Sequence, residues 1–353
     1  REWVWNASGA LRYIQGGAWS DPEYLYFEGE AIDPWSRDAG NGFRCAEYPS
    51  PPAAAALSPI ASPNFDFASL RPVDDSTFAI FRRFYEYVPT PLEARVERTD
   101  TASQWILQEV SYAAAYGGER IPAFVFLPRD VTPPYQTVVY FPGGAAFRNR
   151  PIAAPQAASN LFELSKISFV PRSGRALVYP IYKGSYDRTM DSRGSDIARR
   201  QWMIWVTQDL QRTVDYVVER PDLRNDAIGY LGLSLGAEIA VPIALEKRFA
   251  ALVLVGGAFD PAWRGVSLPE NAPWNFASRV TTPVMLINGR RDFMHPYETG
   301  QVPYFDAFSV PDTAKEFVVL ESGHVPTWNE VISNALRWYD RYLGPGRQES
   351  ARQ

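Results

Sequence analysis

Cysteine and histidine are scarce in this chain of 353 residues. It has one cysteine, Cys45, and two histidines, His295 and His324. A single cysteine excludes an internal disulfide and a zinc site with several cysteine ligands, and two histidines leave little for a metal cluster. The sequence therefore favours chemistry that needs neither a metal ion nor another cofactor.

Long apolar runs and clusters of one charge are also missing. Lys and Arg number 35 against 40 for Asp and Glu, and the formal net charge is −5. Nothing in this pattern indicates a nucleic-acid surface, a membrane patch or a spanning helix. No basic segment followed by an apolar run begins the chain, so no signal peptide is visible. We expect a cytoplasmic protein that binds a small polar or neutral molecule.

Apolar and aromatic residues are abundant, at 46% and 14%, but unevenly arranged. Residues 1–48 are rich in tryptophan and turn formers without a helical period, which predicts a loop-rich segment. Residues 49–69 are rich in proline and alanine, which predicts an extended linker. Residues 70–348 are long enough to bury the main core and form the predicted catalytic domain.

The N-terminal tryptophans need a surface to cover them. A segment of this size cannot readily build an independent core. We therefore expect Trp3, Trp5, Trp19 and Trp35 to pack on the larger domain or on a second copy of the chain, which leaves a homo-oligomer open.

Short apolar runs alternate with helix-length segments in the larger domain. The runs that predict strands are residues 109–112, 121–128, 137–141, 175–179, 227–231, 251–255, 284–287 and 317–320. Residues 196–219 carry an apolar stripe at helical spacing. Strands that alternate with helices predict an α/β fold, with a mostly parallel sheet covered by helices on both faces.

One of these strands runs into the segment Gly232-Leu233-Ser234-Leu235-Gly236 and then into a predicted helix. Gly-x-Ser-x-Gly between a strand and a helix is the pattern of a nucleophile elbow. Glycine is needed at both flanks because the serine backbone is strained and the helix packs close to the strand. The pattern predicts Ser234 as a nucleophile, with a serine in a plain tight turn as the alternative.

A nucleophilic serine needs a base, and the base needs an acid that orients it. His324 follows the last predicted strand, at the sheet edge expected to hold Ser234, and we favour it over His295, which we expect to be a surface or loop-packing residue. Asp292 directly follows the penultimate strand. Asp260, after the strand ending at residue 255, is the alternative acid.

Acyl transfer also needs donors for the oxygen that becomes negative. We expect one from the backbone N–H of Leu235. The other is expected from the loop Phe141-Pro142-Gly143-Gly144-Ala145-Ala146, at Gly144 or Ala145.

Aromatic residues near the predicted edge are candidates for substrate binding. Trp263, Trp274 and Phe276 lie in the connection 256–277, and Tyr182 and Tyr186 are weaker candidates in the loop after residue 179. Packing of these rings onto the body of the domain is the alternative.

These residues predict a serine hydrolase that acts on small acyl esters. A peptidase or amidase is an alternative, because the same three residues serve both reactions. A module that binds a small molecule and reports to another domain is the second alternative.

Residues 95–345 resemble the α/β-hydrolase family, near its acetyl-esterase and dienelactone-hydrolase-like branches. The resemblance rests on the chain order Ser234, Asp292, His324. Residues 109–128, 134–144 and 182–188 look like the hydrolase module fused to bacterial serine/threonine protein kinases. The resemblance implies that the chain cleaves small carboxylic esters without a cofactor. It also implies that a kinase domain lies upstream in the natural polypeptide. Pro142 stands where the family often has a histidine, which leaves the second oxyanion donor open.

Residues 1–45 are similar to the C-terminal end of the formylglycine-generating-enzyme (sulfatase-modifying factor) family. The similarity lies in residues 2–6, 12–19 and 41–46. The redox cysteine pair of active members is missing, so we carry over no oxidase function. Together with the start at Arg1, the resemblance implies a longer natural polypeptide with such a module upstream.

Overall fold

The computed structural model describes residues 1–8, 11–19, 30–45, 47–58, 66–129, 131–147, 164–190, 195–260, 268–292 and 294–346. The chain divides into two compact units, Arg1–Asp66 and Phe67–Gln353. The boundary falls inside the predicted linker 49–69.

The N-terminal unit contains a small antiparallel sheet that the sequence analysis did not predict. Its strands pair in the order β1 (Glu2–Ser8), β2 (Leu11–Gln15) and β3 (Glu30–Ile32). The three short strands cover only part of this loop-rich segment. Aromatic and β-branched residues such as those of β1 favour their extended pairing. One short helix, α1 (Ala54–Leu57), lies in the predicted linker.

The larger unit is built on a nine-stranded sheet. Across the sheet the strands follow one another as β12 (Lys315–Leu320), β11 (Val284–Gly289), β10 (Ala251–Val255), β9 (Leu223–Leu233), β7 (Tyr135–Phe141), β8 (Ala176–Pro180), β6 (Arg120–Pro128), β5 (Trp105–Ala113) and β4 (Arg95–Thr101). The row from β12 to β8 is parallel, and β6, β5 and β4 add antiparallel pairs. Each strand run predicted from the sequence overlaps one of the strands β5 to β12.

Helices connect these strands. They are α2 (Asp75–Arg83), α3 (Leu164–Ile167), α4 (Phe169–Arg172), α5 (Asp196–Glu219), α6 (Leu235–Glu238), α7 (Ala240–Leu245), α8 (Pro273–Ala277), α9 (Val302–Ala307) and α10 (Trp328–Leu343), with short 3-10 turns η2 (Phe67–Ser69), η3 (Gly144–Phe147), η6 (Pro269–Asn271) and η8 (Asp312–Ala314) and a π-helical turn η7 (Tyr297–Gln301). None of the helices in the described ranges is long and apolar enough to span a membrane.

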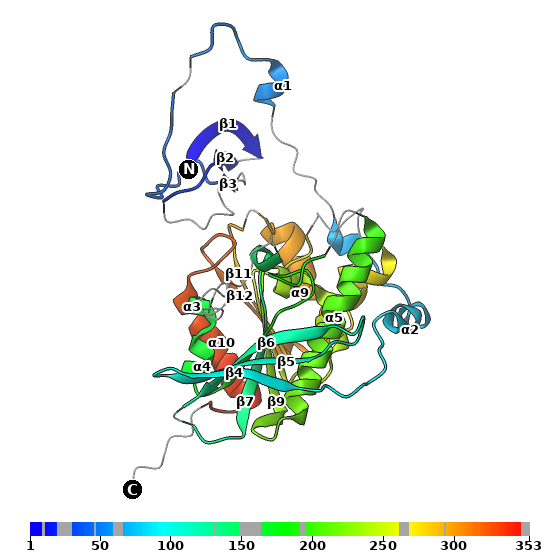
Figure 1. Cartoon of the computed structure of the whole chain (residues 1–353). Coiled ribbons are helices and arrows are strands. Elements are labelled where there is room, and N and C mark those ends of the chain that lie inside the picture. Colours follow the sequence, from blue (N-terminus) through cyan, green and yellow to red (C-terminus); the bar gives the residue numbers. More distant parts are fainter. Residues whose placement is uncertain are drawn as a thin grey trace. The chain divides into compact units, whose positions relative to one another are not determined.

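The two faces of the large sheet are covered by different helices. Helix α5 lies along one face, and α10, α3 and α4 lie along the other (Figure 1). Helix α5 has the predicted bounds and is capped by Ser195, whose hydroxyl accepts a hydrogen bond from the Ala198 N–H at 3.2 Å. Its stripe of Met203, Val206 and Leu210 is fully buried. The predicted α/β architecture, a mostly parallel sheet with helices on both faces, is confirmed.

The register of the parallel strands brings several loops to one edge of this sheet. Val255 at the end of β10 pairs with Leu233 of β9 and with Ile287 of β11, and Gly289 of β11 pairs with Leu320 of β12. Parallel strands have their carboxyl ends at the same edge. The segments that follow β9, β11 and β12 therefore start side by side, and they carry the residues described next.

Candidate active site

Ser234 follows β9 directly and has a strained backbone. Its φ of 49° and ψ of −111° are unusual for a residue with a Cβ atom. The Ser234 N–H donates to the carbonyl oxygen of Val255 at 2.7 Å, which fixes this turn. A Cβ on Gly232 would lie 2.3 Å from the Gly236 oxygen, and one on Gly236 would lie 2.4 Å from the Phe141 oxygen. Glycine at both flanks therefore permits the turn, as expected from the sequence.

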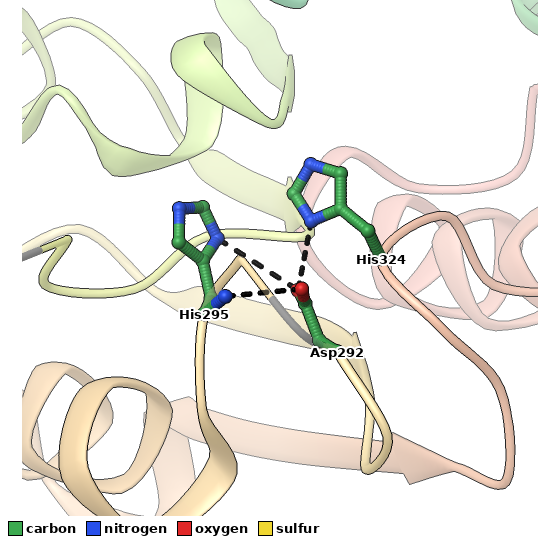
Figure 2. Close-up of side chains that lie close together, drawn as sticks. All are labelled: Asp292, His295 and His324. Atoms are coloured by element: carbon green, nitrogen blue, oxygen red, sulfur yellow. Dashed lines mark hydrogen bonds and ion pairs between the residues drawn. The ribbon is translucent and has the colours of Figure 1, made fainter. Parts of the chain in front are cut away.

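Ser234, His324 and Asp292 form a continuous chain of hydrogen bonds. Ser234 Oγ lies 2.8 Å from His324 Nε2, and His324 Nδ1 lies 2.8 Å from Asp292 Oδ2. The contact between His324 and Asp292 is drawn in Figure 2. An ionised carboxylate only accepts hydrogen bonds, so Nδ1 carries the proton and Nε2 accepts from the serine hydroxyl. The structure thus brings together the three residues that the sequence singled out.

Asp292 is buried, with 4% of its surface exposed, and both of its oxygens accept hydrogen bonds. Oδ1 accepts the backbone N–H groups of Met294 at 2.9 Å and His295 at 3.0 Å. Burial by itself would raise the pKa of this carboxyl. The neighbouring His324, and to a smaller extent His295, lower the pKa below its ordinary value. Asp292 is therefore an anion that can hold the imidazole of His324 in one orientation.

His295 is not a surface residue, and that part of the sequence-based expectation is wrong. It is 1% exposed, its Nδ1 lies 2.9 Å from the Gly256 oxygen, and its Nε2 lies 2.9 Å from Oε2 of Glu238. Its Nδ1 is also 3.8 Å from Asp292 Oδ2. The one signal in the sequence is the short spacing from Asp292, because a turn can bring residues at that spacing into contact.

Asp260, the alternative acid, lies beside His295 and Glu238, and the potential ligand atoms of these three lie within 4.8 Å of one another. The hydrogen bond to His324 comes from Asp292 instead. Two carboxylates and an imidazole can in principle hold a metal ion. Burial would lower the pKa of His295, but Glu238, Asp292 and Asp260 raise it to about 9. We assign the group as an ion pair, on the 2.9 Å contact between His295 Nε2 and Glu238 Oε2.

The loop after β7 carries Gly144 and Ala145, the two candidates for the second oxyanion donor. It forms the 3-10 turn η3, in which the Ala146 N–H donates to the Gly143 oxygen at 3.1 Å. Within the part of the chain that the structure describes, the N–H groups of Gly144, Ala145 and Leu235 donate to no protein acceptor. They are available to a ligand, and the structure leaves both Gly144 and Ala145 as candidates for the second donor.

No family model matches this chain, and no curated protein matches its sequence. Solved structures do match. Acetyl xylan esterase 1 from Thermoanaerobacterium sp. JW/SL YS485 is similar with a TM-score of 0.59 and 16% identity, over 77% of this chain and 95% of that one. An acetyl xylan esterase from Paenibacillus sp. R4 gives 0.57 and 17%, over 76% and 93%. A cold-adapted esterase from an Arctic intertidal metagenomic library gives 0.53 and 17%, over 70% and 98%.

The larger unit has the α/β-hydrolase fold. In such folds a nucleophile stands on a turn between a strand and a helix, and the acid and histidine follow later strands. The places of Ser234 after β9, Asp292 after β11 and His324 after β12 agree with that arrangement.

The aromatic candidates for substrate binding lie mostly inside this α/β-hydrolase unit. Tyr182 is fully buried and donates to the Tyr140 oxygen at 3.1 Å, and the hydroxyl of buried Tyr186 lies 2.8 Å from that of Tyr179. The Tyr186 N–H also donates to the Ala146 oxygen at 3.1 Å. Tyr182 thus packs against β7, and Tyr186 is bonded to the η3 loop. Both side chains are buried and present almost no surface to a ligand.

The connection after β10 behaves similarly. Phe276 is fully buried, with ring centroids 5.2 Å from Phe78 and 5.7 Å from Tyr85. This placement agrees with the packing alternative. Trp274 is half-buried, 6.5 Å from the ring of Phe67. Trp263 lies outside the described residues.

Proposed function

We propose that this chain is a serine esterase that cleaves small carboxylic esters through an acyl-enzyme intermediate. The observation that carries the proposal is the path from Ser234 Oγ through His324 to Asp292, with both contacts at 2.8 Å. A serine hydroxyl is a weak nucleophile, and this path gives it a base and gives the base an orienting anion.

In the proposed reaction Ser234 Oγ attacks the ester carbonyl while His324 Nε2 takes the hydroxyl proton. The imidazolium that forms is stabilised by Asp292 and then donates the proton to the departing alcohol. A water molecule, deprotonated by the same imidazole, attacks the acyl group and releases the acid. The chemistry needs no metal ion or cofactor.

The negative oxygen of each tetrahedral intermediate needs donors that are already in place. Leu235, next to the nucleophile, supplies one N–H in our proposal. Gly144 or Ala145 supplies the other, because Gly236 packs against Phe141 and so places the start of the η3 loop beside the elbow.

Short acyl groups are the proposed substrate class. Two of the matched structures are acetyl xylan esterases and a third is an esterase, and this supports an ester over an amide. The proposal assigns catalysis to residues 70–348 and gives residues 1–48, the segment similar to the formylglycine-generating enzyme, and the linker 49–69 no part in it. Attachment to an upstream kinase stays a prediction from the resemblance.

A fluorophosphonate probe tests the proposal directly. We expect the wild type to be labelled and Ser234→Ala to be unlabelled, while Ser322→Ala, which changes a serine in the loop of His324, keeps its label. Turnover of a short-chain nitrophenyl ester should fall on the order of 10³-fold or more in both Ser234→Ala and His324→Ala. Near wild-type turnover by Ser234→Ala would refute the assignment, and faster cleavage of the matching anilide than of the ester would favour an amidase.

A further inference from the structure

A second histidine lies against the acid of the proposed triad. His295 is 1% exposed, and its ring stands edge-on to that of His324, with centroids 5.0 Å apart and an interplanar angle of 76°. Figure 2 shows both imidazoles reaching the same carboxylate, Asp292. The proposed esterase mechanism uses only His324, so the position of His295 needs its own explanation.

The contacts of His295 determine where its protons are. Nδ1 lies 2.9 Å from the Gly256 carbonyl oxygen, which can only accept, so Nδ1 carries a proton. Nε2 lies 2.9 Å from Oε2 of Glu238, a second acceptor when ionised. This contact is at ion-pair distance but is not aligned as a hydrogen bond. A neutral ring with its proton on Nδ1 would turn the lone pair of Nε2 toward the carboxylate of Glu238, whereas a ring with two protons places a positive charge beside it.

We propose that His295 is a positioning residue, held as a cation by Glu238, and that its charge keeps Asp292 ionised and opposes premature protonation of His324. This inference rests on the proposed esterase function, because it assigns His324 as the base that must be neutral to accept the serine proton. Glu238 belongs to α6, which begins directly after Ser234, so the ion pair also ties the elbow to the loop of Asp292.

The charges around His295 explain why the site needs a cation. Glu238 faces it from α6, Asp260 from the segment after β10, and Asp292 and His324 from the segments after β11 and β12. Tyr304 of α9 is also near Glu238, but its hydroxyl donates to the Ala237 oxygen and stays uncharged, with its pKa raised by burial.

Without the charge on His295, the carboxylates of Glu238, Asp260 and Asp292 would favour a protonated His324. A protonated imidazole cannot act as a base. The raised pKa of His295, about 9, agrees with a cation at neutral pH. The cation therefore offsets part of the carboxylate charge around the two imidazoles.

The protonation of His295 can be measured without any turnover, because the chain has only two histidines. The full chain, labelled with ¹⁵N-histidine, would be followed by NMR from pH 5 to 10, with resonances assigned by His295→Gln. We expect one imidazole with both nitrogens protonated at pH 7, which is missing in His295→Gln and which titrates at lower pH in Glu238→Gln. A neutral His295 at pH 7 would overturn the proposal. The Glu238→Gln titration keeps the test decisive if His295→Gln does not fold.

The effect on the base is measured by the pH profile of kcat/KM for a short-chain nitrophenyl ester. We expect the acid limb of His295→Gln to move to higher pH by about one unit, because the uncompensated carboxylates favour a proton on His324. In Glu238→Gln/His295→Gln, which removes both charges, the limb should return toward the wild-type position. A merely structural histidine would lower the melting temperature and leave the acid limb of all variants in one place, and that result would refute the role.

The two measurements separate the two claims. A cationic His295 in a wild type that cleaves no ester would refute the proposed function and leave the ion pair standing. An active wild type whose acid limb does not move in folded His295→Gln would refute the positioning role and leave the esterase standing.

Discussion

Aromatic side chains behave in opposite ways in the two units of the chain. In the N-terminal unit Trp5, Trp19 and Trp35 are 75%, 92% and 85% exposed, whereas in the larger unit Trp338 and Phe276 are fully buried. A sheet of three short strands buries little, while the nine-stranded sheet has helices on both faces. Aromatic content alone therefore says little about a core, because burial depends on having a second layer to pack against.

The difference extends to polar groups. The hydrogen-bonded chain of Ser234, His324 and Asp292, and the buried ion pair of His295 with Glu238, all belong to the larger unit. Changes there should alter catalysis and stability strongly, and changes among the exposed aromatics of the N-terminal unit should alter either one weakly. The following experiments test this contrast, beginning with the change that should have the largest effect.

The largest effect is expected at the acid. Asp292→Asn keeps the shape of the side chain but removes the anion that orients His324 and stabilises its protonated form. We expect kcat/KM for a short-chain ester to fall on the order of 10²- to 10³-fold. Asp260→Asn is the matched control, because the hydrogen bond to His324 Nδ1 comes from Asp292, and it should change the rate only a few-fold. Equal losses in the two variants would contradict the assignment of Asp292.

A large loss of stability is expected at Phe276. This ring is fully buried and packs edge-on against Phe78 and Tyr85. Removing it in Phe276→Ala should lower the free energy of unfolding by about 3–5 kcal/mol, measured by urea denaturation. Half-buried Trp274 is the comparison within the same helix. Trp274→Ala should change the acyl chain-length preference more than the melting temperature, and the reverse result would place Trp274 among the packing residues.

The buried ion pair predicts how stability depends on pH. The pKa of His295 is raised in the fold to about 9, from about 6.5 in the unfolded chain. The folded state therefore binds the extra proton, so this stabilisation is fully present below about pH 6.5 and is lost as the pH rises through about 9.

The difference in unfolding free energy between wild type and His295→Gln should shrink over that interval. Denaturation at several pH values measures it. In Glu238→Gln the dependence should move to lower pH, because the carboxylate that raises the pKa is gone. A difference that stays constant from pH 6 to 10 would mean that His295 is neutral in the fold.

Much of the larger unit could be predicted because its signals are local. Alternating apolar runs marked β5 to β12, and the stripe of α5 gave the helix its observed bounds. The elbow at Ser234 was predictable because only glycine fits where Gly232 and Gly236 touch other backbone. His324 and Asp292 followed from the rule that parallel strands end at one edge.

The remaining features depend on contacts between distant segments. The pairing of His295 with Glu238 joins the segments after β9 and β11, and no local pattern marks it. The burial of Tyr182 and Phe276 depends on which side of a loop or of the short helix α8 turns inward, and residue type does not determine this. Strands β1 to β3 were missed because they are short and stand among segments rich in turn formers, where a brief alternation gives a weak signal.

The smallest effect is expected in the N-terminal unit. Trp19 is 92% exposed, so Trp19→Ala should change the free energy of unfolding by no more than about 0.5 kcal/mol.

Deletion of residues 1–63 should leave Ser234 reactive toward a fluorophosphonate. The prediction that the tryptophans pack on another surface is tested on the same truncation, by melting temperature and by sedimentation. A lower melting temperature or a changed oligomeric state would support packing, because burying tryptophans contributes about 25 cal/mol per Å² of apolar area. A truncation with an unchanged melting temperature and an unchanged oligomeric state would refute the packing of the tryptophans.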